Sequence, residues 1–433
     1  MHILKKDPEA SDADYSFTPV PLNARKGFWP LLFVMVGFAF NSTGMAVGAK
    51  IGVGTNPHSF ITAMLLGGLF LSAFTGVLGY IGSRTGMTYD QLCRRAYGTK
   101  AFIIPSAMLA VTQIGWFGVC SAMFAIPAAG FFECSPYLTI SIAGLAMTTS
   151  AYIGFKGLEV ISYIAVPLII ILGSLSLYLA LSVKVLSPSL SSGSEVPVYD
   201  MNSMVALVIG SFISGGCSTP NFTRFAARPF SSVVSTVSAF MFGNSLMIVF
   251  GAAGAYCTGS DDIFYVMMSQ GLVLSAFVVL GANIWTTNDN ALYSSGLSLS
   301  SIFLVPKKIM VIAGGLLGTI AAFWLFNNFV HWLVFLGATL PAVGGILIAD
   351  YFVFPYKYTD ENTKSGSCIP ALLGTVAGLV TGNSLDFGCA GINSIAATVL
   401  VWTVLSYPEI KNRNRGLNNK INDGKSLNSD FKG

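Results

Sequence analysis

The chain has 433 residues, of which 53% are hydrophobic and only 10% are charged, and its mean hydropathy is +0.69. Soluble domains carry about 25% charged residues, so this composition excludes an ordinary soluble protein and indicates an integral membrane protein. The net charge of +4 does not indicate nucleic-acid binding, because the basic residues lie between and beyond the apolar segments and form no patch.

Apolar segments of membrane-spanning length follow a polar N-terminal tail. The tail, residues 1–27, is predicted to be mobile, and residues 28–407 form the predicted transmembrane domain. About 17 to 25 apolar residues cross a bilayer as a helix, because a helix satisfies its own backbone groups. The twelve predicted spans are 28–49, 58–82, 102–128, 136–153, 159–182, 201–219, 231–256, 265–288, 309–325, 330–350, 369–384 and 390–407. Residues 408–433 are predicted to be a basic, disordered tail.

The first and sixth segments are predicted to be interrupted at about mid-depth. The first contains Gly37-Phe-Ala-Phe-Asn-Ser-Thr-Gly44, and the sixth contains Gly210-Ser-Phe-Ile-Ser-Gly-Gly216. Discontinuous helices in corresponding positions of two halves are typical of transporters with inverted repeats. Unwound backbone is tolerated in a membrane only where it lines a cavity or contacts a ligand. The alternative is that these glycines only allow close helix packing.

The third segment places an amide beside an indole. Gln113 and Trp116 are three residues apart, so they share one face of a helix. Together they can hydrogen-bond and stack a flat, polar heteroaromatic ring. A lone tryptophan in a membrane helix more often packs or lies at the interface, but this one is in the middle of its segment.

The eighth segment carries a polar stretch, Asn283-Ile-Trp-Thr-Thr-Asn-Asp-Asn-Ala-Leu-Tyr293. Asn283, Thr286, Thr287 and Asn290 are spaced i, i+3, i+4, i+7 and therefore share one helix face. Their amide and hydroxyl oxygens can replace part of the hydration shell of a small cation. Polar groups at this depth usually mark a site or a pathway, although single ones commonly hydrogen-bond neighbouring helices.

The distribution of basic residues predicts the orientation. With the N-terminus in the cytoplasm, all of the 23 lysines and arginines except Lys50 and Lys184 fall on the cytoplasmic side. Because cytoplasmic loops are enriched in Lys and Arg, we expect both termini to be cytoplasmic in a multi-pass membrane protein. The role of Lys50 is left open.

The sequence contains no motif that supports an enzyme. There is no nucleotide-binding loop, no Ser/His/Asp order and no zinc or redox spacing, and the seven cysteines are scattered without a CxxC pair. A channel is disfavoured because it needs a continuous polar stripe along several helices, whereas this chain has one polar cluster. No cofactor is expected apart from a coupling ion.

Several long runs resemble the cytosine permeases of the nucleobase–cation symporter family. The resemblance covers essentially residues 20 to 410. It is carried by Thr112-Gln-Ile-Gly-Trp-Phe-Gly-Val119, Ser211-Phe-Ile-Ser214, Gly243-Asn-Ser-Leu-Met-Ile-Val-Phe-Gly-Ala-Ala-Gly254, Leu280-Gly-Ala-Asn-Ile-Trp-Thr-Thr-Asn-Asp-Asn-Ala-Leu-Tyr293, Asn327-Asn-Phe-Val330 and Ala349-Asp-Tyr351. The chain departs from the family pattern at Asn41-Ser-Thr-Gly-Met and at Cys217-Ser-Thr-Pro220.

The resemblance implies a fold and a set of site residues. The fold is a ten-helix inverted repeat of the leucine-transporter type plus two further helices. The implied sodium ligands, between the first and eighth helices, are backbone carbonyls near Gly37 and Phe40 and the side chains of Asn283, Thr286 and Thr287. The base is expected to stack between Trp116 and Phe212, with hydrogen bonds from Gln113, Asn288, Ser211 and Ser214.

The resemblance predicts a symporter that imports cytosine with sodium through the lipid bilayer of the bacterial inner membrane. Relatives with the same architecture carry purines, allantoin or hydantoins, so those substrates remain alternatives. Proton coupling through Asp289, the only carboxylate in the polar stretch, is the alternative to sodium.

Overall fold

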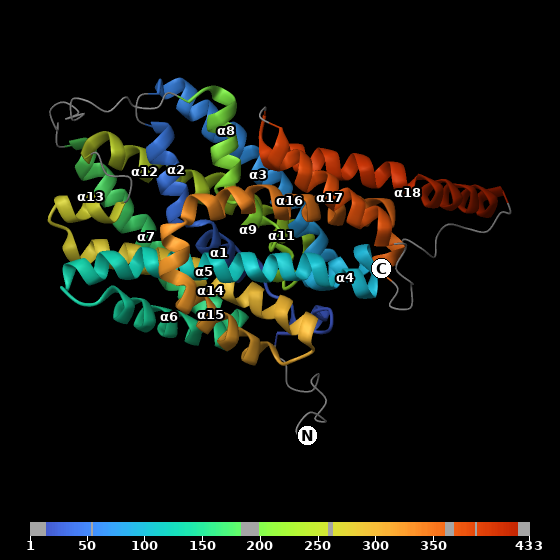
Figure 1. Ribbon diagram of the computed structural model, residues 1–433, viewed down its shortest axis with the longest axis horizontal. Coiled ribbons are helices and arrows are strands. Elements are labelled where there is room, and N and C mark those ends of the chain that lie inside the picture. Colours follow the sequence, from blue (N-terminus) through green and yellow to red (C-terminus); the bar gives the residue numbers. More distant parts are fainter. Residues whose placement is uncertain are drawn as a thin grey trace, which may run out of the picture.

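The computed structural model describes residues 14–52, 55–182, 199–258, 263–359, 368–385 and 388–422. Over these ranges the chain forms helices, and an isolated bridge between Lys26 and Ala226 is the β-type pairing found there. The helices pack side by side into one elongated molecule (Figure 1). The predicted all-helical fold class is confirmed.

The helix bounds agree with most of the predicted spans. The helices are α1 Phe28–Ala39, α2 Ser42–Gly52, α3 Pro57–Thr85, α4 Tyr89–Ala101, α5 Ile103–Phe131, α6 Pro136–Ile153, α7 Phe155–Ser182, α8 Met201–Gly210, α9 Ile213–Gly216, α10 Pro220–Thr223, α11 Pro229–Ser238, α12 Ser245–Thr258, α13 Ile263–Ser269, α14 Val273–Phe303, α15 Lys307–Asn327, α16 Phe329–Val353, α17 Cys368–Ser384 and α18 Ala390–Asn422. A π-helical turn, η3 Ala239–Asn244, joins α11 to α12.

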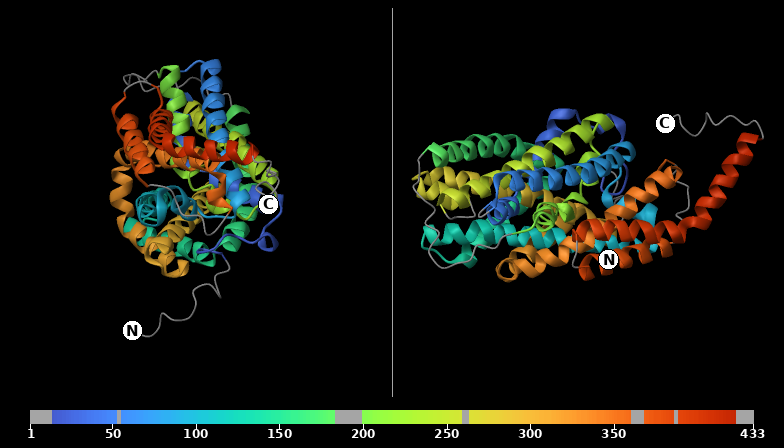
Figure 2. Two further views of the ribbon diagram at one scale, coloured as in Figure 1. Left: turned by 90° about the vertical axis from the view of Figure 1, so that its right-hand side faces the viewer. Right: turned by 90° about the horizontal axis from the view of Figure 1, so that it is seen from above.

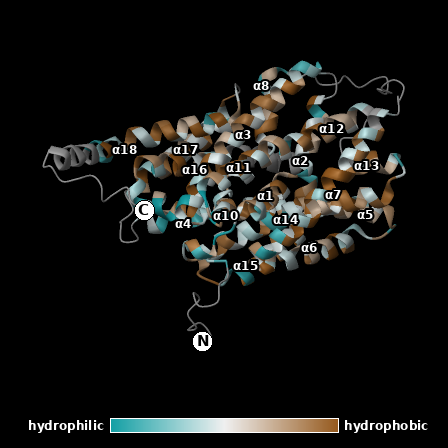
Figure 3. Cartoon of the chain, turned by 180° about the vertical axis from the view of Figure 1, so that it is seen from behind, coloured by the Kyte–Doolittle hydropathy of each residue, from teal (hydrophilic) through white to brown (hydrophobic). Residues whose placement is uncertain are grey.

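Six helical runs within the described residues are long and apolar enough to cross a membrane. They are α3, α5, α7, the run from α11 to α12, α15 and α18, and two bent pairs have the same character, α1 with α2 and α8 with α9 and α10. Hydrophobic residues predominate along the long helices, whereas hydrophilic residues gather at the end that holds α4 (Figure 3). The other four predicted spans overlap α6, α14, α16 and α17, and the count of twelve stays a prediction.

Both predicted interruptions are present. The axes of α1 and α2 meet at 52°, and those of α8 and the run from α9 to α10 meet at 45°. Phe40 has extended backbone angles at the first break. There Asn41 Oδ1 accepts a hydrogen bond from Gly44 N at 2.7 Å and so caps the start of α2.

The helices divide into two packed sets. The first set, called the bundle here, consists of α1, α2, α3 and α8 to α12, in which α2 packs on α12, and α3 packs on α8, α10 and α11. The second, called the scaffold, consists of α5, α6, α14 and α15, which contact one another and lie together in the lower half of Figure 1. Both broken helices therefore belong to the bundle, and the polar stretch of α14 belongs to the scaffold.

The predicted bounds of the eighth span, 265–288, are wrong. Gly271 has φ 76°, a conformation that favours glycine, and the chain turns there between α13 and α14. The residues after the polar stretch continue the helix because they are almost all buried against neighbours. The polar stretch consequently lies in the middle of a 31-residue helix instead of at its end.

Both terminal tails are more ordered than expected. Residues 14–27, which were predicted to be mobile, pack on the helix ends through backbone hydrogen bonds such as Val20 N to Gly86 O at 2.8 Å. At the other end, α18 continues to Asn422, past the predicted limit at 407, and extends beyond the other helices (Figure 2). Residues 1–13 and 423–433 lie outside the described residues.

A buried carboxyl group lies at the start of α4, outside the apolar helices. Thr88 and Gln91 form a capping box there, and the Asp90 side chain points inward and is 1% exposed. Burial raises the pKa of Asp90 to about 6, although the nearby Ser106 and Ser298 hydroxyl groups and the charge of Arg224 act in the opposite direction. Ionised Asp90 is therefore destabilising relative to its neutral form.

We expect Asp90→Asn to stabilise the protein at neutral pH. The carboxyl pKa is about 2 units higher in the folded chain than the usual 3.8, so ionisation costs the fold on the order of 3 kcal/mol above pH 6. This cost is absent below pH 4, where the carboxyl group is neutral in both the folded and the unfolded chain, and it is complete once the pH has risen above 6. Melting curves of wild type and variant in detergent should therefore diverge between pH 4 and pH 7. Asp200→Asn is the control, because Asp200 is an exposed residue that caps the start of α8.

Candidate binding pocket

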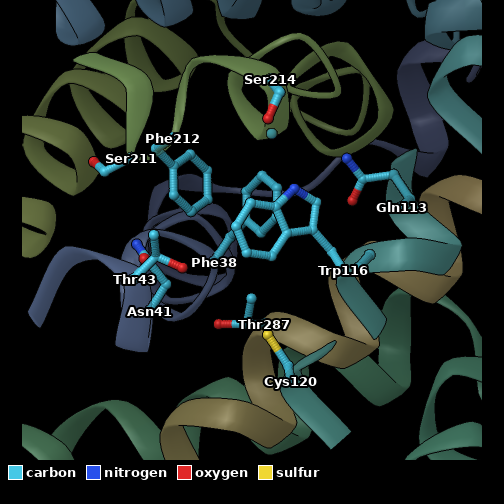
Figure 4. Close-up of a pocket in the computed structure, with 12 residues that line it drawn as sticks. Phe38, Asn41, Thr43, Gln113, Trp116, Cys120, Ser211, Phe212, Ser214 and Thr287 are labelled. Carbon is cyan, nitrogen blue, oxygen red and sulfur yellow. The ribbon is translucent and has the colours of Figure 1, made fainter. Parts of the chain in front are cut away.

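A pocket lies where the two broken helices of the bundle face α5 and α14 of the scaffold (Figure 4). Its lining residues are Phe38, Asn41, Thr43, Gln113, Trp116, Cys120, Ser211, Phe212, Ser214, Gly215, Thr287 and Ala291. Five of the six predicted substrate-binding residues are brought together here, Gln113, Trp116, Ser211, Phe212 and Ser214. The roles of these residues stay predictions.

Aromatic rings form opposite parts of the wall. Trp116 extends from α5, and Phe212 lies at the break between α8 and α9 (Figure 4). The Phe212 ring is held edge-on by Phe38 at 4.8 Å and by Phe240 at 5.0 Å between ring centroids. A Cβ atom at Gly215 would lie 3.0 Å from the Phe212 ring, so a larger residue there would displace the ring by a few tenths of an ångström. The pocket therefore presents two large, fixed apolar faces.

Gln113 contributes a buried polar group to the pocket that lacks a hydrogen-bond partner. Its side chain is 1% exposed, lines the pocket, and its Nε2 atom has no hydrogen-bond partner among the described residues. A buried amide donor without an acceptor costs about 1–3 kcal/mol. A ligand carbonyl or ring nitrogen in the pocket would remove that cost. By contrast, Ser211 Oγ is already bonded to Val208 O at 2.7 Å.

Asn288 lies behind the pocket and is absent from its lining. Its Nδ2 atom donates to Phe117 O at 3.2 Å and to Ser121 Oγ at 3.0 Å, and both acceptors belong to α5. In this structure Asn288 therefore links α14 to α5 within the scaffold. Its predicted contact with substrate stays a prediction.

The predicted sodium ligands do come together at the first break. Thr287 Oγ1 donates to Phe40 O at 2.6 Å and to Asn283 O at 3.1 Å. A Cβ atom at Gly37 would lie 3.4 Å from Thr286 Cβ, so α1 and α14 are in close contact. Ser42 Oγ donates to Asn283 Oδ1 at 3.2 Å. The result is a cluster of neutral oxygen atoms between α1 and α14.

Asp289 points away from the pocket and from the cluster of oxygen atoms between α1 and α14. Its Oδ1 atom accepts a hydrogen bond from Ser150 Oγ at 2.5 Å, and Ser150 Oγ also accepts one from Trp285 Nε1 at 2.8 Å. The carboxyl group is thus directed toward α6. Among the described residues no three His, Cys, Asp or Glu side chains form a group that could hold a metal ion.

Six lining residues were not predicted as site residues from the sequence: Phe38, Asn41, Thr43, Cys120, Gly215 and Ala291. Cys120 could have been found, because it lies one helical turn after Trp116 on the same face. Asn41 and Thr43 belong to the polar run at the first break, where the direction of each side chain depends on the bend.

Comparison with known proteins gives a family for this architecture. Residues 19–367 match the family described as permeases for cytosine/purines, uracil, thiamine and allantoin. The chain belongs to this permease family. The permease is 43% identical over 399 residues to the cytosine permease of Escherichia coli (strain K12). This alignment covers 92% of this chain and 95% of the relative. It is 23% identical to the hydantoin permease of Microbacterium maritypicum, over 62% of this chain and 61% of the relative.

Solved structures place the permease in a transporter fold. It superimposes with a TM-score of 0.75 on Mhp1, a nucleobase-cation-symport-1 family transporter with bromovinylhydantoin bound, at 18% identity over 91% of this chain and 95% of that one. A Na+-coupled sialic acid symporter gives a TM-score of 0.71 at 12% identity, over 93% of each chain. The predicted resemblance to nucleobase–cation symporters is confirmed. The permease is a membrane transporter and not an enzyme.

Proposed function

We propose that the permease is a secondary active symporter that imports cytosine with sodium across the inner membrane. The observation that carries the proposal is the buried, unpartnered Nε2 of Gln113 in a pocket with two fixed aromatic faces, Trp116 and Phe212. The 43% identity to a cytosine permease over 92% of the chain supports the choice of base.

Cytosine fits this pocket chemically. It is flat, so its two faces can stack on aromatic rings, as bases do on proteins. One edge presents an amino donor beside a ring-nitrogen acceptor and a carbonyl acceptor. The Gln113 amide offers a donor and an acceptor to that edge.

Sodium is the proposed coupling ion because the oxygen atoms around Thr287 and Phe40 are neutral. Neutral oxygens suit a bound metal cation, whereas proton coupling requires a group that titrates in the working pH range. Asp289 is the carboxylate of the same stretch, but it is directed toward Ser150 and away from this cluster. Proton coupling through Asp289 is therefore the competing proposal.

The proposed orientation places both termini in the cytoplasm. It rests on the basic residues, of which only Lys50 and Lys184 fall on the other side. With this orientation, α4 and residues 14–27 lie at the cytoplasmic end of the molecule.

A panel of bases tests the substrate. We expect purified protein to bind cytosine more tightly than uracil by about tenfold or more, because uracil has a carbonyl in place of the amino group and a proton on the adjacent ring nitrogen. Both contacts with the amide would then be reversed, and an amide held in the orientation that suits cytosine would leave them unpaired. Competition binding with cytosine, uracil, a purine and a hydantoin measures the order.

Gln113→Met keeps the length of the side chain, removes both polar atoms and should abolish the preference for cytosine. Gln270→Met, at a glutamine bonded to Ser176 outside the pocket, is the matched control. Tighter binding of a purine or hydantoin than of cytosine would replace cytosine as the substrate. Equal competition by uracil would indicate a general pyrimidine carrier.

A further inference from the structure

Three side chains of α14 that carry oxygen atoms lead from the oxygen cluster toward the end of the molecule that holds α4. They are Asn290, Ser294 and Ser298, called the oxygen row here, and each is at most 1% exposed. They follow Thr287 at three, seven and eleven residues, so all four share one face of the helix. Because a helix rises about 1.5 Å per residue, the row ends about 16 Å from Thr287 along α14.

Each member of the oxygen row has an oxygen atom without a hydrogen-bond partner among the described residues. The Asn290 amide is fixed in orientation, because Nδ2 donates to Thr286 O at 2.7 Å and Oδ1 is the atom left over. A serine in a helix commonly bonds to a carbonyl of its own helix, as Ser295 Oγ does at 2.9 Å. Ser294 and Ser298 make no such bond, so their oxygen atoms remain available to a ligand.

The oxygen row ends at the buried carboxyl group of Asp90, near the start of α4. Within the described part of the chain, neither carboxylate oxygen has a hydrogen-bond partner. The hydroxyl groups of Ser298 and of Ser106 in α5 lie nearby, and the Ser106 hydroxyl is also buried and unpartnered. Three helices therefore bring two hydroxyl groups and a carboxylate close together without a hydrogen bond between them.

A small cation is the ligand that fits these atoms. The unpartnered atoms of the oxygen row, of Ser106 and of Asp90 are all oxygens, which are the ligands that hard cations prefer. Water alone would satisfy the hydroxyl groups, but an ionised carboxylate away from solvent also requires a positive charge. An anion is disfavoured, because the carboxylate would repel it.

Two cationic side chains near Asp90 limit how tightly it can hold a cation. Arg224 faces it from the bundle, but its guanidinium donates to backbone carbonyls and to Tyr293 Oη and not to the carboxylate. Arg94, on α4 itself, is exposed and lies over the Phe102 ring at 4.3 Å. Their charges weaken the attraction of Asp90 for a cation. A position on a conduction path must bind weakly enough to release its ion, so this arrangement suits a transit position.

We infer that Asn290, Ser294, Ser298 and Asp90 form the exit path of the coupling cation, with Asp90 as its last position before the cytoplasm. The cation leaves the neutral cluster at Thr287, moves along the oxygen row and reaches the carboxylate. Since Thr287 bonds to α1 from the same helix face, the path runs between the scaffold and the bundle. The inference rests on the proposed function for the cation and for the orientation.

Net uptake and exchange of cytosine in proteoliposomes distinguish the exit of the cation from the movement of the substrate. Net uptake driven by a sodium gradient requires sodium to leave on the inner side, whereas exchange of labelled cytosine with saturating sodium on both sides does not. At about pH 8 the carboxyl group is ionised, since the pKa of Asp90 is about 6. We expect Asp90→Asn to slow net uptake there by about tenfold, because a neutral amide attracts a cation less than a carboxylate does. Exchange should keep the wild-type rate.

The serines of the oxygen row provide a test that leaves the charge in place. Ser294→Ala combined with Ser298→Ala removes two oxygen atoms and should slow net uptake by a smaller factor, again without slowing exchange. Ser295→Ala is the matched control, because that hydroxyl is bonded within α14. Asp200→Asn is the control for the carboxylate, since Asp200 is exposed. Both controls should leave net uptake and exchange unchanged.

Asp90→Asn is expected to be more stable than the wild type at neutral pH, so a lower rate in this variant is not explained by misfolding. Net uptake at the wild-type rate in Asp90→Asn would overturn the exit path. An equal loss of net uptake and exchange would also overturn it, because the whole transport cycle would then be slower. Wild-type uptake that does not respond to the sodium gradient would instead contradict the proposed function, so the two proposals fail in different measurements.

Discussion

Trp116→Ala is expected to weaken cytosine binding by about fivefold to a hundredfold or more while leaving the fold intact. Stacking a base on an aromatic side chain contributes about 1–3 kcal/mol, and about 1.4 kcal/mol corresponds to tenfold in affinity. Trp116 lines the pocket and is 8% exposed, so its indole is available to a ligand on one side and packed on the others. Equilibrium binding of cytosine to the purified variant measures the loss.

Two further variants distinguish the loss of stacking from damage to the fold. Trp116→Phe keeps an aromatic face and should recover much of the affinity. Trp324→Ala removes an indole that is 65% exposed on α15, far from the lining residues, and should leave binding unchanged. Wild-type affinity in a well-folded Trp116→Ala protein would remove this residue from the site.

Sodium is expected to raise cytosine affinity by about 5- to 150-fold at fixed pH, the usual range for coupling between two sites. The reason is geometric, because Phe40 O and Thr287 Oγ1 lie 2.6 Å apart between α1 and α14. A cation held there would join the bundle to the scaffold beside the pocket. Binding of cytosine in sodium and in choline buffer measures the factor, and cytosine must raise sodium affinity by the same factor.

Thr287→Ala should lower sodium affinity and therefore cytosine affinity at low sodium, with partial recovery when sodium is raised. Thr319→Ala is a matched control, because that hydroxyl bonds to Gly315 O within α15 at 2.7 Å and lies outside the site. Affinity that is equal in sodium and choline but follows pH would contradict sodium coupling. Asp289→Asn would then be the variant that removes the dependence.

Local sequence signals were sufficient for the helix breaks and for much of the pocket. Glycines beside small polar residues predicted both interruptions, and these place Phe212 and Ser214 opposite α5. Gln113 and Trp116 share a face through simple helix geometry. Asn288 shows the limit of this reasoning, because its hydrogen bonds to Phe117 and Ser121 depend on how α14 is rotated against α5.

Contacts between distant parts of the chain could not be predicted from local pattern. Residues 14–27 are polar and contain no periodic apolar face, which is typical of a mobile tail. Their order comes from Arg224 and Lys307, two cations that a hydropathy profile assigns only to loops. Likewise, α14 continues past the polar stretch because its serines and Tyr293 are buried by neighbouring helices.

The contacts of residues 14–27 also have a consequence for the order in which the protein is made. Asp14 leaves the ribosome before its partners Arg224 and Lys307, which follow 210 and 293 residues later. Chains fold from the N-terminus as they are synthesised, so the Asp14 carboxylate must wait until α15 has been inserted before its charge is neutralised. Packing of this segment is therefore one of the last steps of biogenesis, and a nascent chain that stops before α15 cannot complete it.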